Sequence, residues 1–537
     1  MEQGFLSIIL HTHLPFVRHP EHSSFLEEDW LFEAITESYI PLLNMLASLK
    51  LDQVHCRITM SLTPPLMSML KDQLLMERYL KHLDSLIWLS EKEVSRTRFE
   101  PHLNRLALMY NQNFSATRED FLNKYHGDLI GAFRHFQEAG LIEIMASAAT
   151  HGYLPLMIHP EALRAQIQIG IDYYTHVFGI SPGGFWLPEC AYTPGVDEYL
   201  ADGGIRYFIM DSHGILHSKP RPRYAVYAPV YCPSGVAAFG RDWESSKQVW
   251  SAQEGYPGDW EYREFYRDIG HELDYEYLAP HLKGNIRHHT GIKYYRITGK
   301  TSAKQLYDPA RAWEKAAIHA GNFMFNRQRQ IEYIAGAMPD RKPIVVAPYD
   351  TELFGHWWYE GPQWLDCLIR KLHYDQDQVR LITPGDYLKM YPKNQVCTPS
   401  MSSWGYKGYN EVWLEGSNDW IYPHLHMMAE RMTQLVDNHW SGDNLVTEAI
   451  KQAARELVLA QSSDWAFIMK TGTMVSYAVK RTEDHIVQFN RLYEQIQRGD
   501  IDREFLRDLQ ERDNIFPDLD PWVYSSNYRP KEVTLSG

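Results

Sequence analysis

The chain has 537 residues and a mass of 62.8 kDa, which predicts a large domain and at least one more. With 53 Lys and Arg against 68 Asp and Glu, the net charge is -15, which repels phosphate backbones and anionic membrane surfaces. We therefore expect no nucleic-acid or membrane partner. The chain starts without a basic leader, and its five cysteines are scattered. These features predict a cytoplasmic protein without a disulfide framework.

Short apolar segments of strand length recur along the first 400 residues, and helical patterns lie between them. The segments are 5–10, 54–62, 142–148, 183–189, 206–211, 342–350 and 379–383. This alternation predicts an α/β fold with parallel βα units, and about seven strands favour a barrel. An open doubly wound sheet is the weaker alternative, because no glycine-rich phosphate loop follows any strand.

Three parts of the chain depart from the alternation. Residues 66–141 are predicted to be a helical insertion, and residues 401–537 to be a second, all-helical domain packed on a catalytic domain of residues 1–400. Residues 240–268 are polar, aromatic and rich in glycine without a clear period. We expect a long loop there, of the kind that often covers a site.

Two carboxylates come directly after apolar strands. Glu189 ends GGFWLPE and Asp350 ends KPIVVAPYD, and in a barrel the carboxyl ends of different strands meet at one mouth. An acid at such a position can also cap a helix or pair with an arginine. Aromatic residues and a histidine surround both acids, which is typical of carbohydrate sites. These neighbours are Trp186, Tyr192, Tyr349, His356, Trp357 and Trp358.

A pair of carboxylic residues is what glycoside chemistry requires. One attacks or stabilises the anomeric carbon, while the other donates a proton to the leaving oxygen. Glu189 and Asp350 are therefore the predicted catalytic pair. A carboxyl separation of about 5 to 5.5 Å would indicate a retaining mechanism through a covalent intermediate.

Two histidines stand in HTHLPF at the end of the first predicted strand. His11 and His13 are two residues apart and therefore point to one face. They can bind a sugar, or they can be core histidines. They can also bind a metal in a hydrolase or deacetylase, with His151, His213 and Asp350 as further ligands. The residues alone leave these alternatives open.

Five segments in chain order resemble the sequence blocks of glycoside hydrolase family 57, and specifically its α-1,4-glucan branching enzymes. The segments are HTHLPF, ATHGYLPL, GFWLPECAY, APYDTELFGHWWYEGP, and a last block around WGYKGYNEVWLEG and SSDWAF. Together they cover nearly the whole chain. The resemblance implies a distorted (β/α)7 barrel with an inserted helical region and a C-terminal helical domain. It also implies a retaining mechanism, with Glu189 as nucleophile and Asp350 as acid/base.

The resemblance further implies an α-glucan substrate and no metal or other cofactor. His11, His13, His151 and His356 would then hold glucose hydroxyls. Further glucan contacts implied by matching are Arg267, Gly284, Trp404 and Asp464, with Trp186, Trp357 and Trp413 as additional aromatic candidates. Family branching enzymes close the site with a loop that carries a tyrosine at its tip. The tyrosines to compare here are Tyr256 and Tyr262 in the loop of 240–268.

The expected activity is cleavage of an α-1,4 glucan and transfer of the chain to a 6-hydroxyl. An α-amylase or 4-α-glucanotransferase of the same family would use the same acids. A metal-dependent carbohydrate deacetylase would lose activity with chelators and tolerate Glu189→Gln. A non-catalytic glucan-binding protein is the remaining alternative. The oligomeric state is not predicted.

Overall fold

The computed structural model describes residues 2–250, 254–284, 286–440 and 444–530. Its central sheet has parallel strands in the order β7-β5-β4-β3-β2-β1-β8, with β6 antiparallel at the outer edge of β7, and β9 pairs with the start of β1. The strands are β1 (Gly4–Thr12), β2 (Ile58–Leu62), β3 (Ile142–Ser147), β4 (Gly184–Trp186), β5 (Tyr207–Met210), β6 (Val230–Tyr231), β7 (Ala237–Gly240), β8 (Ile344–Asp350) and β9 (Val379–Leu381).

The sheet curves so that its two ends approach each other. Just after β7, the backbone N–H of Asp242 donates to the carbonyl of Val346 in β8 at 2.8 Å. The barrel predicted from the alternation is therefore confirmed, and the open sheet is wrong. β1 is buried along its whole length, as expected for a parallel strand covered on both faces.

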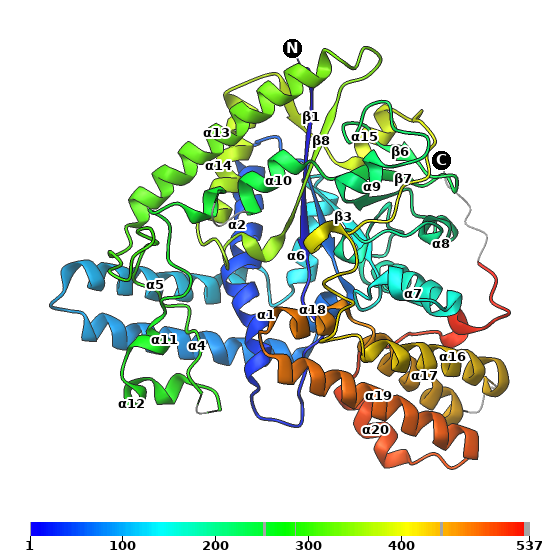
Figure 1. The fold of residues 1–537 in the computed structure, drawn as a ribbon. Coiled ribbons are helices and arrows are strands. Elements are labelled where there is room, and N and C mark those ends of the chain that lie inside the picture. Colours follow the sequence, from blue (N-terminus) through cyan, green and yellow to red (C-terminus); the bar gives the residue numbers. More distant parts are fainter. Residues whose placement is uncertain (1, 251–253, 285, 441–443, 531–537) are drawn as a thin grey trace.

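Helices make up most of the chain between and after the strands. In chain order they are α1 (Asp29–Ala34), α2 (Ile40–Leu51), α3 (Pro64–Leu70), α4 (Gln73–Arg96), α5 (Pro101–Glu119), α6 (Leu129–Glu138), α7 (Pro160–Phe178), α8 (Val196–Asp202), α9 (Ser212–Leu216), α10 (Trp243–Trp250), α11 (Ile269–Glu272), α12 (Tyr275–Leu278), α13 (Pro309–Ala335), α14 (Gly361–Tyr374) and α15 (Pro384–Met390). The long helices α4 and α5 lie side by side and extend away from the sheet (Figure 1).

The last part of the chain is helical. It comprises α16 (Ile421–His439), α17 (Asn444–Ala460), α18 (Ser463–Thr471), α19 (Val475–Arg498) and α20 (Arg503–Arg512), drawn from gold to red in Figure 1. The start of α18 reaches the barrel, because Ser462 forms an isolated bridge with Gly152 after β3. Leu457, Phe489 and Leu492 are fully buried in this part of the chain.

One sequence prediction needs correction. Residues 240–268 are not a continuous loop, because Trp243–Trp250 form helix α10. Ser245, Ser246 and Val249 are the buried residues of this helix, so its packing face is short and mostly polar and gives little apolar periodicity. Within the described residues, no helix is both long and apolar enough to cross a membrane.

Candidate active site

A cavity of about 810 Å³ opens at the carboxyl ends of the strands. Asp350 is the last residue of β8 and lies beside His11 of β1 in the strand register. Parallel strands bring these side chains to one edge of the barrel. The predicted site residues in the cavity wall are His11, His13, His151, Glu189, Asp350, Trp357, Trp404, Trp413 and Asp464.

Glu189 is held by two side-chain donors. Trp404 Nε1 donates to its Oε2 at 2.9 Å, and Ser463 Oγ donates to its Oε1 at 3.0 Å. The backbone of Glu189 has φ 60°, a left-handed conformation that is uncommon for a residue with a side chain. Such strain persists only where the surroundings enforce it, and it is frequent at functional sites.

The electrostatics around both acids favour retention of a proton. Burial raises the pKa of Glu189 to about 7, although the hydrogen bond from Trp404 acts in the opposite direction. Burial also raises the pKa of Asp350 well above its usual range, and the charges of Glu352 and Glu189 raise it further. Two acids with perturbed pKa values in one cavity are suited to acid/base chemistry.

Three histidines form a stacked group on one side of the cavity. His11 and His151 face each other with their Nε2 atoms 3.1 Å apart, and the ring of His11 stacks on Trp186 at 4.3 Å. His13 Nε2 lies 3.0 Å from Asp464 Oδ2. Burial lowers the pKa of His11 and of His151, so both rings are neutral at neutral pH and can donate and accept.

Asp464 shifts the pKa of His13 in the opposite direction from the pKa values of His11 and His151. Burial alone would lower the pKa of His13, but the charge of Asp464 and its hydrogen bond raise it above the ordinary value. The ion pair joins the end of β1 to the start of α18. The helical part of the chain therefore supplies Ser463 and Asp464 to a site whose acids come from the barrel.

His13, His151 and Asp464 also meet the simplest geometric condition for a metal site. They offer three ligand atoms that lie within 4.8 Å of one another. In this structure the same atoms have protein partners: His13 bonds to Asp464, and His151 Nδ1 lies 2.9 Å from Ser463 Oγ. A metal would have to replace these contacts.

Several predicted residues lie outside the cavity wall. Trp186 is fully buried behind His11. His356 is turned away, because its Nδ1 bonds to Glu37 at 2.6 Å. Arg267 pairs with Glu272 and lies 3.6 Å above the ring of Tyr295. Gly284 is in an exposed segment after α12. The structure thus gives none of the four a direct position in the cavity.

The cavity wall contains further residues that the sequence did not single out. Glu352 accepts a hydrogen bond from Tyr39 at 2.6 Å, and burial raises its pKa to about 7. Glu352 comes two residues after Asp350, and this position next to a predicted catalytic acid could have identified it from the sequence. Arg241 directly follows β7, a strand that the sequence did not predict, and Arg263, Phe265 and Tyr266 lie in an irregular segment whose spacing does not indicate the cavity.

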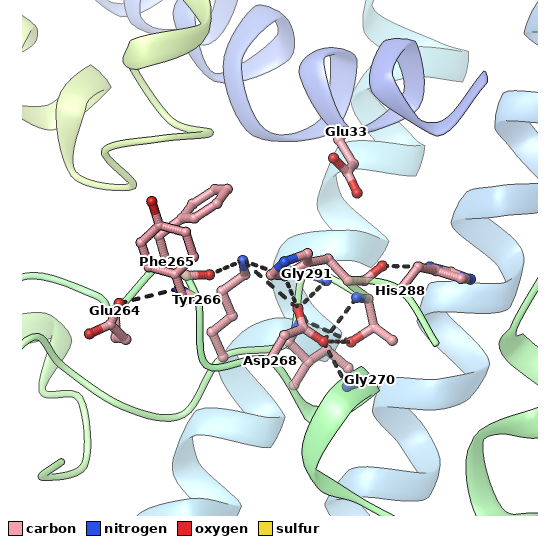
Figure 2. A network of polar contacts seen from close by, with 12 residues as sticks. Glu33, Glu264, Phe265, Tyr266, Asp268, Gly270, His288 and Gly291 are labelled. Atoms are coloured by element: carbon pink, nitrogen blue, oxygen red, sulfur yellow. Dashed lines mark hydrogen bonds and ion pairs between the residues drawn. The ribbon is translucent and has the colours of Figure 1, made fainter. Parts of the chain in front are cut away.

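The segment with Phe265 and Tyr266 is anchored by a buried carboxylate, Asp268 (Figure 2). The side chain of Asp268 accepts hydrogen bonds from the N–H groups of Gly270 and Gly291 and from Thr290. The ammonium of Lys293 lies 3.9 Å from Asp268 and donates to the carbonyl of Phe265. The network fixes the aromatic wall, in which Phe265 stacks on Trp357 at 4.4 Å.

The candidate lid tyrosines do not line the cavity. Tyr256 donates to Asn322 at 2.7 Å and stacks on His319, while Tyr262 is fully buried and contacts the same histidine. Tyr266 is different: it lines the cavity and is 74% exposed. The tyrosine in the cavity wall is therefore one that the sequence prediction did not consider.

A barrel with two partly buried acids at its mouth and a cavity lined by aromatic residues and histidines is typical of enzymes that act on carbohydrates. The sequence profile of glycosyl hydrolase family 57 matches residues 7–400, and that of the C-terminal part of 1,4-alpha-glucan branching enzymes matches residues 424–524. The chain belongs to glycoside hydrolase family 57.

Individual relatives cover nearly the whole chain. A 1,4-alpha-glucan branching enzyme of Thermococcus kodakarensis is 34% identical over 98% of this chain and 80% of its own. The crystal structure of a family 57 branching enzyme of Pyrococcus horikoshii superposes with a TM-score of 0.88 at 34% identity, covering 99% of this chain and 98% of that one. The α-amylase AmyC of Thermotoga maritima superposes with a TM-score of 0.92 at 44% identity, covering 98% and 100%.

Proposed function

We propose that this protein is a 1,4-α-glucan branching enzyme acting by a retaining double displacement. The observation that carries the proposal is the placement of Glu189 and Asp350 in one cavity with Trp404, whose indole bonds to Glu189. The match of residues 424–524 to branching-enzyme C-terminal parts, and the branching activity named for two relatives, support it.

In the first step, the carboxylate of Glu189 attacks the anomeric carbon of a bound α-1,4-linked glucose. The bond to the leaving oxygen breaks, and Asp350 transfers its proton to that oxygen. Asp350 must hold a proton for this role, which its raised pKa favours. Trp404 and Ser463 orient the attacking carboxylate through their hydrogen bonds.

In the second step, the ionised Asp350 takes the proton from a 6-hydroxyl of another glucan chain. That oxygen attacks the anomeric carbon, the bond to Glu189 breaks, and an α-1,6 linkage forms with retained configuration. Water competes with the 6-hydroxyl for the same intermediate. In this proposal the rings of His11 and His151, which line the cavity, exchange their mutual contact for hydroxyls of the bound glucose.

A second candidate function is that of an α-amylase. Two observations favour it: the named activity of the 44% identical AmyC structure, and the packing of Tyr256 and Tyr262 away from the cavity. Neither Tyr256 nor Tyr262 would cover the intermediate. Exclusion of water would therefore depend on the exposed Tyr266 and its neighbours.

The deciding experiment incubates the purified protein with amylose and measures new reducing ends in parallel with α-1,6 linkages. We expect branches in excess of reducing ends, and reducing ends without branches would replace the branching proposal by the amylase one. The same assay with EDTA tests the metal alternative. Activity should persist after chelation, whereas loss restored by added Zn²⁺ would support a metal at His13, His151 and Asp464.

A further inference from the structure

A second groove of about 460 Å³ lies next to the catalytic cavity. The two are separated by the short turn Tyr256–Gly258: Pro257 and Gly258 line the cavity, while Tyr256 and Gly258 line the groove. A chain that leaves the cavity over this turn enters the groove directly.

The groove has an aromatic platform. Trp260 is 65% exposed. Its indole packs so closely against Gly299 that a Cβ atom on that residue would lie 3.0 Å from the ring. Gly299 has a φ of 91°, so both its backbone and its missing side chain suit this close approach. A large indole exposed in a groove and supported from behind is a surface on which a sugar ring can stack.

The acidic residues that line the groove have basic partners, either in the groove or beside it. Asp259 Oδ2 lies 3.8 Å from Lys315 Nζ and 3.6 Å from His319 Nε2, and Glu261 pairs with Arg296 at 3.1 Å. A phosphate would have to compete for basic groups that are already paired with acids, and a cation would have to compete for acids that are already paired with basic groups. A neutral polyhydroxyl ligand can use the same groups as donors and acceptors without breaking the pairs.

We propose that this groove is a glucan-binding site for the part of a long α-glucan chain that extends beyond the catalytic cavity. This inference rests on the proposed action on α-glucan and adds a preference for long chains. Trp260 supplies the stacking surface, and Asp259, Glu261 and Lys315 supply hydrogen bonds to hydroxyls. The groove contributes to binding, and it takes no part in bond cleavage.

The test compares Trp260→Ala with Trp313→Ala. Trp313 is a matched control: it is 58% exposed and lies on α13 two residues before Lys315, a spacing that directs it to another face of the helix. For amylose we expect Trp260→Ala to raise KM about fivefold with unchanged kcat, the effect of losing one stacking contact. For a maltooligosaccharide short enough to fit the cavity, KM should stay at the wild-type value.

Three further measurements make the outcome decisive. Trp260→Phe should recover most of the amylose KM, and thermal unfolding should show that Trp260→Ala is folded. In the inactive Glu189→Gln background, Trp260→Ala should weaken equilibrium binding of amylose by a similar factor. An equal rise in KM for long and short substrates, or no change for amylose, would overturn the inference. A wild-type protein inactive on both substrates would instead refute the proposed function.

Discussion

At the scale of single residues, the two acids occupy different surroundings that suit different roles. Burial raises the pKa of Glu189 to about 7, but the hydrogen bonds from Trp404 and Ser463 act in the opposite direction and favour its ionised form. Asp350 faces the negative charges of Glu352 and Glu189, which favour its protonated form. This difference is consistent with the proposed roles, in which Glu189 attacks and Asp350 donates a proton.

Substitution of each acid should separate these roles. Asp350→Asn is expected to lower kcat on amylose by about 10²- to 10⁴-fold, the contribution of a general acid. With an α-glycosyl fluoride, whose leaving group needs no proton, the first step should recover in Asp350→Asn but not in Glu189→Gln. Release of fluoride is the measurement. Equal recovery in both variants would contradict the assignment of the nucleophile.

Trp404→Phe should shift the pH dependence of the reaction. The indole N–H stabilises the carboxylate of Glu189 and lowers its pKa, so removing it raises that pKa. Because the ionised form attacks, the acidic limb of kcat/KM against pH should move to higher pH. A profile that loses amplitude without moving would show that Trp404 acts only by stacking on glucan.

At the scale of elements, sequence patterns predicted the long strands better than the short ones. β8 is a continuous apolar run that ends in an acid, and it forms as expected. β7 was missed, because AAFG has four residues, two of them alanine, and no β-branched side chain. β9 was predicted, but it pairs only with the first residues of β1 and is not the strand that follows β5 in the barrel.

In the candidate site, too, residues at the ends of apolar strands were predicted from the sequence, whereas residues of irregular segments were not. Glu189, Asp350, His11 and His13 follow apolar strands, and the topology of a parallel barrel brings strand ends together. Arg263 and Phe265 lie in an irregular segment whose path depends on the buried Asp268 network, a tertiary arrangement without a local pattern. The roles of all these residues stay predictions.

Asp268→Asn tests the anchor of that segment. Burial alone would raise the pKa of Asp268, but hydrogen bonds and the charge of Lys293 lower it from 3.8 to about 2. The folded form thus gains stability above pH 3.8 that is lost as the pH falls toward 2. Asp268→Asn should cost about 2 kcal/mol at neutral pH.

Urea unfolding at several pH values measures this cost. The difference between wild type and Asp268→Asn should be largest at neutral pH and shrink as the pH falls below about 4. Thr290→Val is a useful comparison, because it removes one hydroxyl donor to Asp268 without removing a charge. A pH-independent difference for Asp268→Asn would contradict the ionic origin of the stability.

At the scale of the whole molecule, the site is assembled from distant parts of the chain. The barrel provides Glu189 and Asp350, and α18 provides Ser463 and Asp464. The boundary at 400/401 stays a prediction, and it separates residues that meet in one cavity. The helical part therefore contributes residues to the candidate active site.

Asp464→Asn tests this dependence without removing a domain. It leaves the shape of the side chain but removes the charge that raises the pKa of His13. We expect kcat/KM on amylose to fall about tenfold, the value of one hydrogen bond to a charged group. Thermal unfolding is the control. If the lower kcat/KM came from a destabilised fold, Asp464→Asn would also have a lower unfolding temperature than the wild type.

The contact of α18 with Glu189 has a consequence for synthesis of the protein. Ser463 and Asp464 are made after Glu189 and Asp350, so a chain still growing on the ribosome carries both acids without the hydroxyl that bonds to Glu189 and the carboxylate that pairs with His13. Truncated translation products would carry the same defect. We therefore expect catalytic competence to appear only after the chain has been translated beyond Asp464.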